Sequence, residues 1–211
     1  YLNFMDEIQE INAPDYILDT LGPGKNLTPV DLNKFLFRKD GEENNHRLSV
    51  IDWDEKTRQA EEEGVLEFPK DLPWASYRVG TTLPPVWTND HEALLIFHGI
   101  EKVMILKNGR EEPHYIYSLG RALLRNDEEG RLYIWDEEID RKPILTREDI
   151  PFEGERYSQR KVVYVCGGSV DEKDGKKVLS LLVNVGDLKT FQVTYSLEDL
   201  MAGLRKGSWT A

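Results

Sequence analysis

Three polar residues stand beside short apolar or glycine-containing runs: Arg78, His98 and Asp187. Taken alone, each has a structural interpretation: Arg78 as a surface or ion-pair residue, His98 as a packed core histidine, and Asp187 as a turn residue. The sequence contains no nucleophile elbow with a Ser-His-Asp order, no His-Glu-x-x-His and no Gly-x-Gly-x-x-Gly. The familiar motifs for serine hydrolysis, zinc-dependent proteolysis and dinucleotide binding are therefore absent.

The elements that must position these residues are short strands, which become clear from about residue 74. Turn signals separate them, namely Asn108-Gly109, Glu129-Gly130 and Asp174-Gly175. Near the C-terminus, Ser196 with Asp199 three residues later predicts the start of a short helix. The pattern predicts an all-β protein, and it leaves a sandwich and a propeller equally open. The expected strands are Leu94–His98, Val103–Leu106, Ile116–Leu124, Leu132–Trp135, Lys161–Cys166, Val178–Val185 and Phe191–Tyr195.

Composition excludes several classes of function. The 211 residues carry a net charge of −12, which disfavours both nucleic acid and anionic membrane surfaces as partners. Five Trp, nine Tyr and seven Phe are too many aromatic residues for a disordered chain. The single cysteine, Cys166, excludes an internal disulfide. No apolar run reaches the length of a membrane span and no signal peptide is recognisable, so we expect a cytoplasmic protein.

The ordered set of motifs resembles glycoside hydrolase family 130, the mannoside phosphorylases and β-mannosidases, which are five-bladed β-propellers. The likeness covers about residues 74–205 and matches the C-terminal blades of the family. It implies a five-bladed propeller, or a partial one with about three blades, followed by the short helix. The matching pieces, in order, are Arg78–Pro85, Phe97–Gly99, Tyr117–Leu124, Pro143–Leu145, Cys166-Gly167, Asp187 and Ser196-Leu197.

The resemblance also implies roles for three residues, and strand spacing adds two candidates. Arg78 takes the place of a family lysine that contacts phosphate, and His98 matches a second phosphate contact. Asp187 matches a carboxylate that contacts sugar hydroxyls. Tyr117 and Arg121 are evenly spaced on one expected strand, so they face the same side and are candidates for binding substrate.

The activity implied is inverting phosphorolysis of a β-mannosidic bond, with inorganic phosphate as co-substrate and no other cofactor. A phosphorylase needs cationic donors to hold phosphate, whereas an inverting hydrolase needs a second carboxylate to activate water. The family's general acid lies in a stretch resembling Glu-Asp-Pro-Arg, which does not occur here, so the catalytic residue is unidentified. The alternatives are a β-mannosidase that uses water, a non-catalytic glycan-binding or scaffold propeller, and an unrelated β-sandwich.

The expected organisation has three parts. Residues 1–32 form an irregular segment or the remnant of an earlier blade, residues 33–205 form the blades, and residues 206–211 form a tail. The expected partner is an oligosaccharide that contains mannose. We expect no metal, because no cluster of His, Asp and Glu residues has the spacing of metal ligands. An incomplete propeller exposes strand edges, so we also expect pairing with a second copy or with a missing N-terminal portion.

Overall fold

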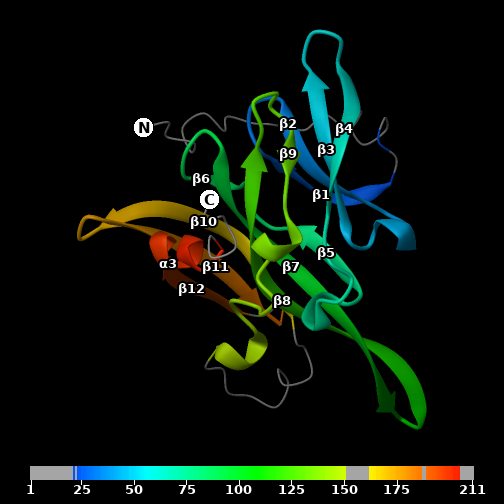
Figure 1. Cartoon of the computed structure of the whole chain (residues 1–211). Helices are drawn as coiled ribbons and strands as arrows, with labels where there is room; N and C mark the ends of the chain where they lie inside the picture. The colour runs from blue at the N-terminus through cyan, green and yellow to red at the C-terminus, as the bar shows by residue number, and fades with distance from the viewer. Residues whose placement is uncertain (1–20, 22, 151–161, 187–188, 205–211) are drawn as a thin grey trace.

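The computed structural model describes residues 21, 23–150, 162–186 and 189–204. These residues form three antiparallel β-sheets, and one short helix follows the last strand (Figure 1). The prediction of an all-β protein is confirmed. None of the helices in the described ranges has the length and apolar character needed to cross a membrane.

The first sheet, sheet A, is made by strands that follow one another along the chain. Its order is β1-β2-β3-β4. Its first strand begins at Gly24, within the segment expected to be irregular, and a bulge interrupts the pairing of β1 and β2. The bounds are β1 Gly24–Pro29, β2 Lys34–Lys39, β3 Arg47–Asp54 and β4 Gln59–Glu67.

The second sheet, sheet B, contains the two longest strands. Its order is β5-β7-β8-β9, and β6 also pairs with β7. The runs Leu94–His98 and Val103–Leu106, expected as separate strands, are parts of one strand, because β7 pairs with β8 from Glu92 to Lys107. The bounds are β5 Arg78–Thr81, β6 Val86–Trp87, β7 Glu92–Lys107, β8 Arg110–Asn126 and β9 Leu132–Tyr133.

The third sheet, sheet C, has the order β10-β11-β12 and leads directly into the helix. Ser196 caps that helix by accepting a hydrogen bond from the Asp199 amide at 3.2 Å, as the sequence predicts. Elsewhere in the described part of the chain lie four 3-10 turns: η1 Glu42–Asn44, η2 Pro73–Ala75, η3 Asp136–Glu138 and η4 Arg147–Asp149. The remaining bounds are β10 Val163–Lys173, β11 Lys176–Val185, β12 Lys189–Ser196 and α3 Leu197–Ala202.

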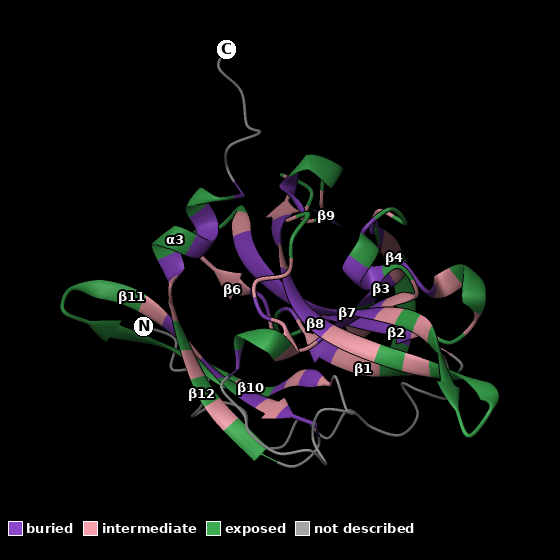
Figure 2. Cartoon of the chain, turned by 90° about the horizontal axis from the view of Figure 1, so that it is seen from below, coloured by how far each residue is buried: buried purple, intermediate pink, exposed green. Residues whose placement is uncertain are grey.

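Sheet B lies between the other two sheets and contributes to two separate hydrophobic cores. Successive residues of a strand point to opposite faces, so β7 divides its apolar side chains between them. Leu95 and Phe97 pack with residues of sheet A, whereas Leu94 and Ile96 pack with residues of sheet C and α3. Buried residues are accordingly concentrated along β7 and β8 (Figure 2).

Candidate anion-binding site

The site is built on one face of sheet B, where β5 runs beside β7. Arg78 lies opposite Ile100, and Gly80 lies opposite His98. A Cβ atom at position 80 would be 2.6 Å from the His98 ring and 3.3 Å from Nη1 of Arg38. The missing side chain of Gly80 therefore makes room for His98 on β7 and for Arg38 on β2 of sheet A.

His98 is almost completely buried, with 2% of its surface exposed. Its ring packs near Tyr117 of β8 and Tyr164 of β10, with centroid distances of 5.9 and 5.5 Å. Burial, and secondarily the charge of Arg38, lower the pKa of His98 to about 3, so its imidazole is neutral near pH 7. Its buried Nδ1 has no hydrogen-bond partner among the described residues.

Arg38, near the end of β2, is the least expected member of this cluster, because its charged side chain is buried and only 5% exposed. Among the described residues, its Nε atom has no hydrogen-bond partner and its guanidinium forms no ion pair. Burial and the nearby charge of Arg78 lower its pKa from the usual arginine value. Even so, a guanidinium keeps its charge in proteins.

Arg78 supplies a second positive charge, whose field reaches Arg38. Its Nε atom donates a hydrogen bond to the Oδ1 atom of Asn45 at 2.8 Å, and its guanidinium lies 5.1 Å from the centre of the Tyr77 ring. Asn45 is itself fixed, since its carbonyl oxygen accepts a hydrogen bond from the Val79 amide at 2.8 Å. Arg78, like Arg38, has no ion pair with a carboxylate among the described residues.

This arrangement is chemically suited to binding an anion. Burying a charge without a partner costs free energy, and two like charges held side by side add to that cost. A phosphate or carboxylate placed between the guanidinium groups would relieve both penalties and would accept charge-assisted hydrogen bonds. A neutral His98 could add one N–H donor without adding charge.

The structure brings together three of the five site residues that the sequence predicts. Arg78, His98 and Tyr117 all belong to this face of sheet B. Arg121 lies on the same face but does not join the cluster, because its Nε donates to Asp140 at 3.0 Å and its Nη1 donates to carbonyl oxygens of α3. Asp187 lies outside the described residues.

Two members of the site, Arg38 and Tyr164, are missing from the sequence prediction. Arg38 follows the run Phe35-Leu36-Phe37, and the whole stretch is buried. A charge that interrupts or ends a buried apolar strand is a usable signal, because it must find a partner or a ligand. Tyr164 alternates with two buried valines of β10, which gives no comparable signal.

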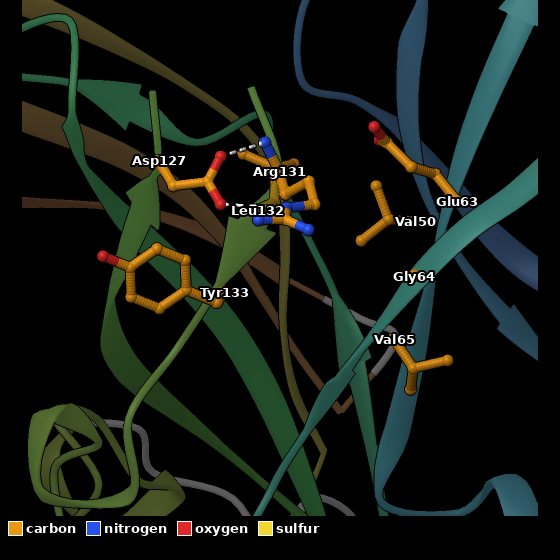
Figure 3. Close-up of a pocket in the computed structure, with 8 residues that line it drawn as sticks. All are labelled: Val50, Glu63, Gly64, Val65, Asp127, Arg131, Leu132 and Tyr133. Carbon is orange, nitrogen blue, oxygen red and sulfur yellow. Dashed lines mark hydrogen bonds and ion pairs between the residues drawn. The ribbon is translucent and has the colours of Figure 1, made fainter. Parts of the chain in front are cut away.

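A cavity of about 280 Å³ between β4 and β9 is a less suitable anion site. Figure 3 shows that its Asp127 side chain points toward Arg131, to which it is hydrogen-bonded at 3.0 Å. Its Glu63 forms an ion pair with Lys34 at 2.6 Å. The charges here already neutralise one another. Within the described ranges, no group of three His, Cys, Asp or Glu side chains could hold a metal ion.

The chain matches no protein-family model and no curated protein. The resemblance to glycoside hydrolase family 130 therefore stays a prediction.

Proposed function

We propose that the cluster of Arg38, Arg78 and His98 binds inorganic phosphate, and that the chain acts on mannose-containing glycans as an inverting β-mannoside phosphorylase does. The observation that carries this proposal is the buried guanidinium of Arg38, which has no anionic partner among the described residues. The antiparallel pairing of strands within each of the three sheets is also compatible with the blades of a propeller.

In the proposed reaction, a phosphate oxygen attacks the anomeric carbon of the mannosyl group from the face opposite the glycosidic oxygen. The new C–O bond forms as the glycosidic C–O bond breaks, and a carboxylic acid protonates the departing oxygen. Arg38 and Arg78 would hold and orient the phosphate, and the His98 N–H would donate to one of its oxygens.

A second candidate function is binding without turnover, in a propeller that retains the anion site and lacks the general acid. The observation that favours it is that the Glu-Asp-Pro-Arg stretch expected to carry the general acid does not occur in the sequence. The carboxylate whose field reaches Arg38, Asp40, is an exposed residue.

The test combines binding and turnover. Isothermal titration with inorganic phosphate should show binding that Arg38→Met weakens at least tenfold, while Arg110→Met, a change of an exposed arginine at a hairpin tip, leaves it unchanged. Incubation with β-mannobiose and phosphate should release mannose 1-phosphate. Binding without turnover would favour the non-catalytic candidate, and mannose release without phosphate would favour a β-mannosidase. Absence of phosphate binding in the unmodified chain would overturn the proposal.

A further inference from the structure

The face of sheet B that carries the anion site continues outward along the hairpin of β7 and β8. Direct partners in an antiparallel pair share a face, and residues two apart on a strand do as well. Gly80 is opposite His98, Arg78 and Tyr117 are both opposite Ile100, and Lys102 is opposite Tyr115. These side chains therefore form one continuous strip, about 13 Å long from His98 to Lys102 at roughly 3.3 Å per residue.

The outer end of this strip is an aromatic and cationic platform made by Tyr77, Lys102 and Tyr115. The Tyr77 and Tyr115 ring centres are 5.4 Å apart, and the Lys102 ammonium lies 5.5 Å from the centre of the Tyr77 ring. Arg78 contacts the same Tyr77 ring at 5.1 Å, so the platform is physically continuous with the anion site. The Tyr77 amide is anchored to the Ile100 carbonyl oxygen at 2.9 Å.

The platform is open to solvent. Tyr115 is 37% exposed, and Lys102 is exposed and makes no ion pair with a described residue. Beyond it, the end of the hairpin projects away from sheets A and C (Figure 1). An exposed aromatic ring beside an unpaired amine matches a sugar, whose C–H groups pack on the ring face while its hydroxyl oxygens accept hydrogen bonds from the amine.

We propose that Tyr77, Lys102 and Tyr115 bind the leaving-group sugar of the glycan, which is the acceptor sugar in the reverse reaction. This inference rests on the proposed function and assigns a subsite to it. In an inverting displacement the leaving group departs on the side of the mannosyl ring opposite the phosphate. With phosphate held near Arg38 and His98, the mannosyl ring lies along the strip beside Tyr117, and the leaving sugar lies further out on the platform.

The test measures sugar affinity and phosphate affinity separately. β-Mannobiose is titrated into the unmodified chain, Tyr115→Ala, Tyr115→Phe, Lys102→Met and Glu112→Ala, each with and without saturating phosphate. Glu112 lies on the same strand as Tyr115 but on the other face of the hairpin, which makes it a matched control. Tyr115→Ala should weaken mannobiose binding about tenfold, whereas Tyr115→Phe and Glu112→Ala should retain it. Phosphate affinity should stay unchanged in all four variants.

In the reverse reaction, from mannose 1-phosphate, Tyr115→Ala should raise the KM for the acceptor sugar and leave the KM for mannose 1-phosphate unchanged. The inference is overturned if the unmodified chain binds no mannobiose, or if Tyr115→Ala and Lys102→Met bind it as tightly as the unmodified chain. It is also overturned if Tyr115→Ala changes only the sedimentation coefficient, since the platform would then join two copies of the chain. If the unmodified chain binds mannobiose and does not bind phosphate, that result would instead contradict the proposed function.

Discussion

Two pairs of arginines have opposite surroundings: Arg121 and Arg125 on β8 of sheet B, and Arg78 on β5 of sheet B with Arg38 on β2 of sheet A. Arg125 is held by Glu138, with the Nη2–Oε1 contact at 2.5 Å, and by Glu92 at 3.1 Å, and Arg121 is held by Asp140 at 3.0 Å. Arg38 and Arg78 have no such partners among the described residues, although Arg38 is buried. Paired cations stabilise the fold, whereas unpaired ones leave a charge for a ligand to neutralise.

The pKa directions express the same contrast. A hydrogen bond from Arg125 to Glu138 raises the pKa of that arginine despite partial burial. Burial and the charge of Arg78 lower the pKa of Arg38. The protein, with a net charge of −12, thus has more acidic than basic side chains overall, while one site lacks acidic partners for its arginines. Local potential is set by the few charges that converge there, whatever the net charge.

The largest effect is expected from breaking the paired arrangement. Glu138→Ala removes a carboxylate whose side chain is 1% exposed and leaves Arg125 with Glu92 alone. Loss of one partner of a buried ion pair should lower the free energy of unfolding by about 3 kcal/mol, measured by urea denaturation. Glu129→Ala, which removes an exposed partner of Arg131, should leave it unchanged. Equal stability of Glu138→Ala and the unmodified chain would contradict a structural role for this pair.

The second prediction concerns the unpaired member, Arg38. Arg38→Met keeps the length of the side chain and removes the buried charge, so phosphate binding should lose about 2 kcal/mol, or roughly thirtyfold in affinity. The free energy of unfolding should stay the same or rise, because the charge has no partner to lose. Calorimetric titration and urea denaturation measure the two quantities on the same sample. A strongly destabilised Arg38→Met chain would show that Arg38 is structural, like Arg125.

The third prediction uses acid to disturb the site. His98 has an unfolded pKa near 6.5 and a folded pKa of about 3, so the unfolded chain binds a proton that the folded chain does not between these values. The contribution of His98 to the free energy of unfolding should therefore be fully present well above pH 6.5 and should be lost as the pH is lowered. At pH 5 the free energy of unfolding should be about 2 kcal/mol lower for this reason. His98→Gln should remove this contribution, measured by urea denaturation between pH 7 and 4. If His98→Gln has the same pH dependence of stability as the unmodified chain, the lowered pKa of His98 would be refuted.

The smallest effect is expected from Arg78→Lys, which keeps the positive charge and removes the planar fork. Lysine cannot reproduce the 2.8 Å hydrogen bond from Nε to Asn45 or a bidentate grip on phosphate. Phosphate affinity should fall about threefold to tenfold, or about 1 kcal/mol, in calorimetric titration. Arg78→Gln should weaken binding further, since it also removes the charge. If Arg78→Lys and Arg78→Gln are equally weak, geometry decides binding at this position.

The second half of the fold could be predicted from the sequence because its turns are encoded locally. Asn108 and Gly109 have φ angles of 52° and 76°, and Asp174 and Gly175 have φ angles of 54° and 73°, as tight hairpin turns require. The sequence of sheet A predicts its strands less clearly. Its strand β4 carries three consecutive glutamates, and a bulge between β3 and β4 breaks the alternation of polar and apolar residues.

The candidate site could be predicted only in part, for a physical reason. Arg78, His98 and Tyr117 lie on adjacent strands of one sheet, where even spacing relates side chains on a common face. Arg38 and Tyr164 reach the site from the other two sheets. Their meeting depends on how the sheets stack, which the spacing of residues along the chain does not specify.

The long strand β7 has a consequence for how the protein opens. Residues Ala93–Ile100 are buried from both sides, whereas the segment from Lys102 to Lys107 runs out into the projecting hairpin. Amide hydrogens of the inner segment should exchange with solvent only through global unfolding, and those of the outer segment through local fraying. A single strand would then contain both extremes of hydrogen-exchange protection, with the boundary lying between His98 and Lys102.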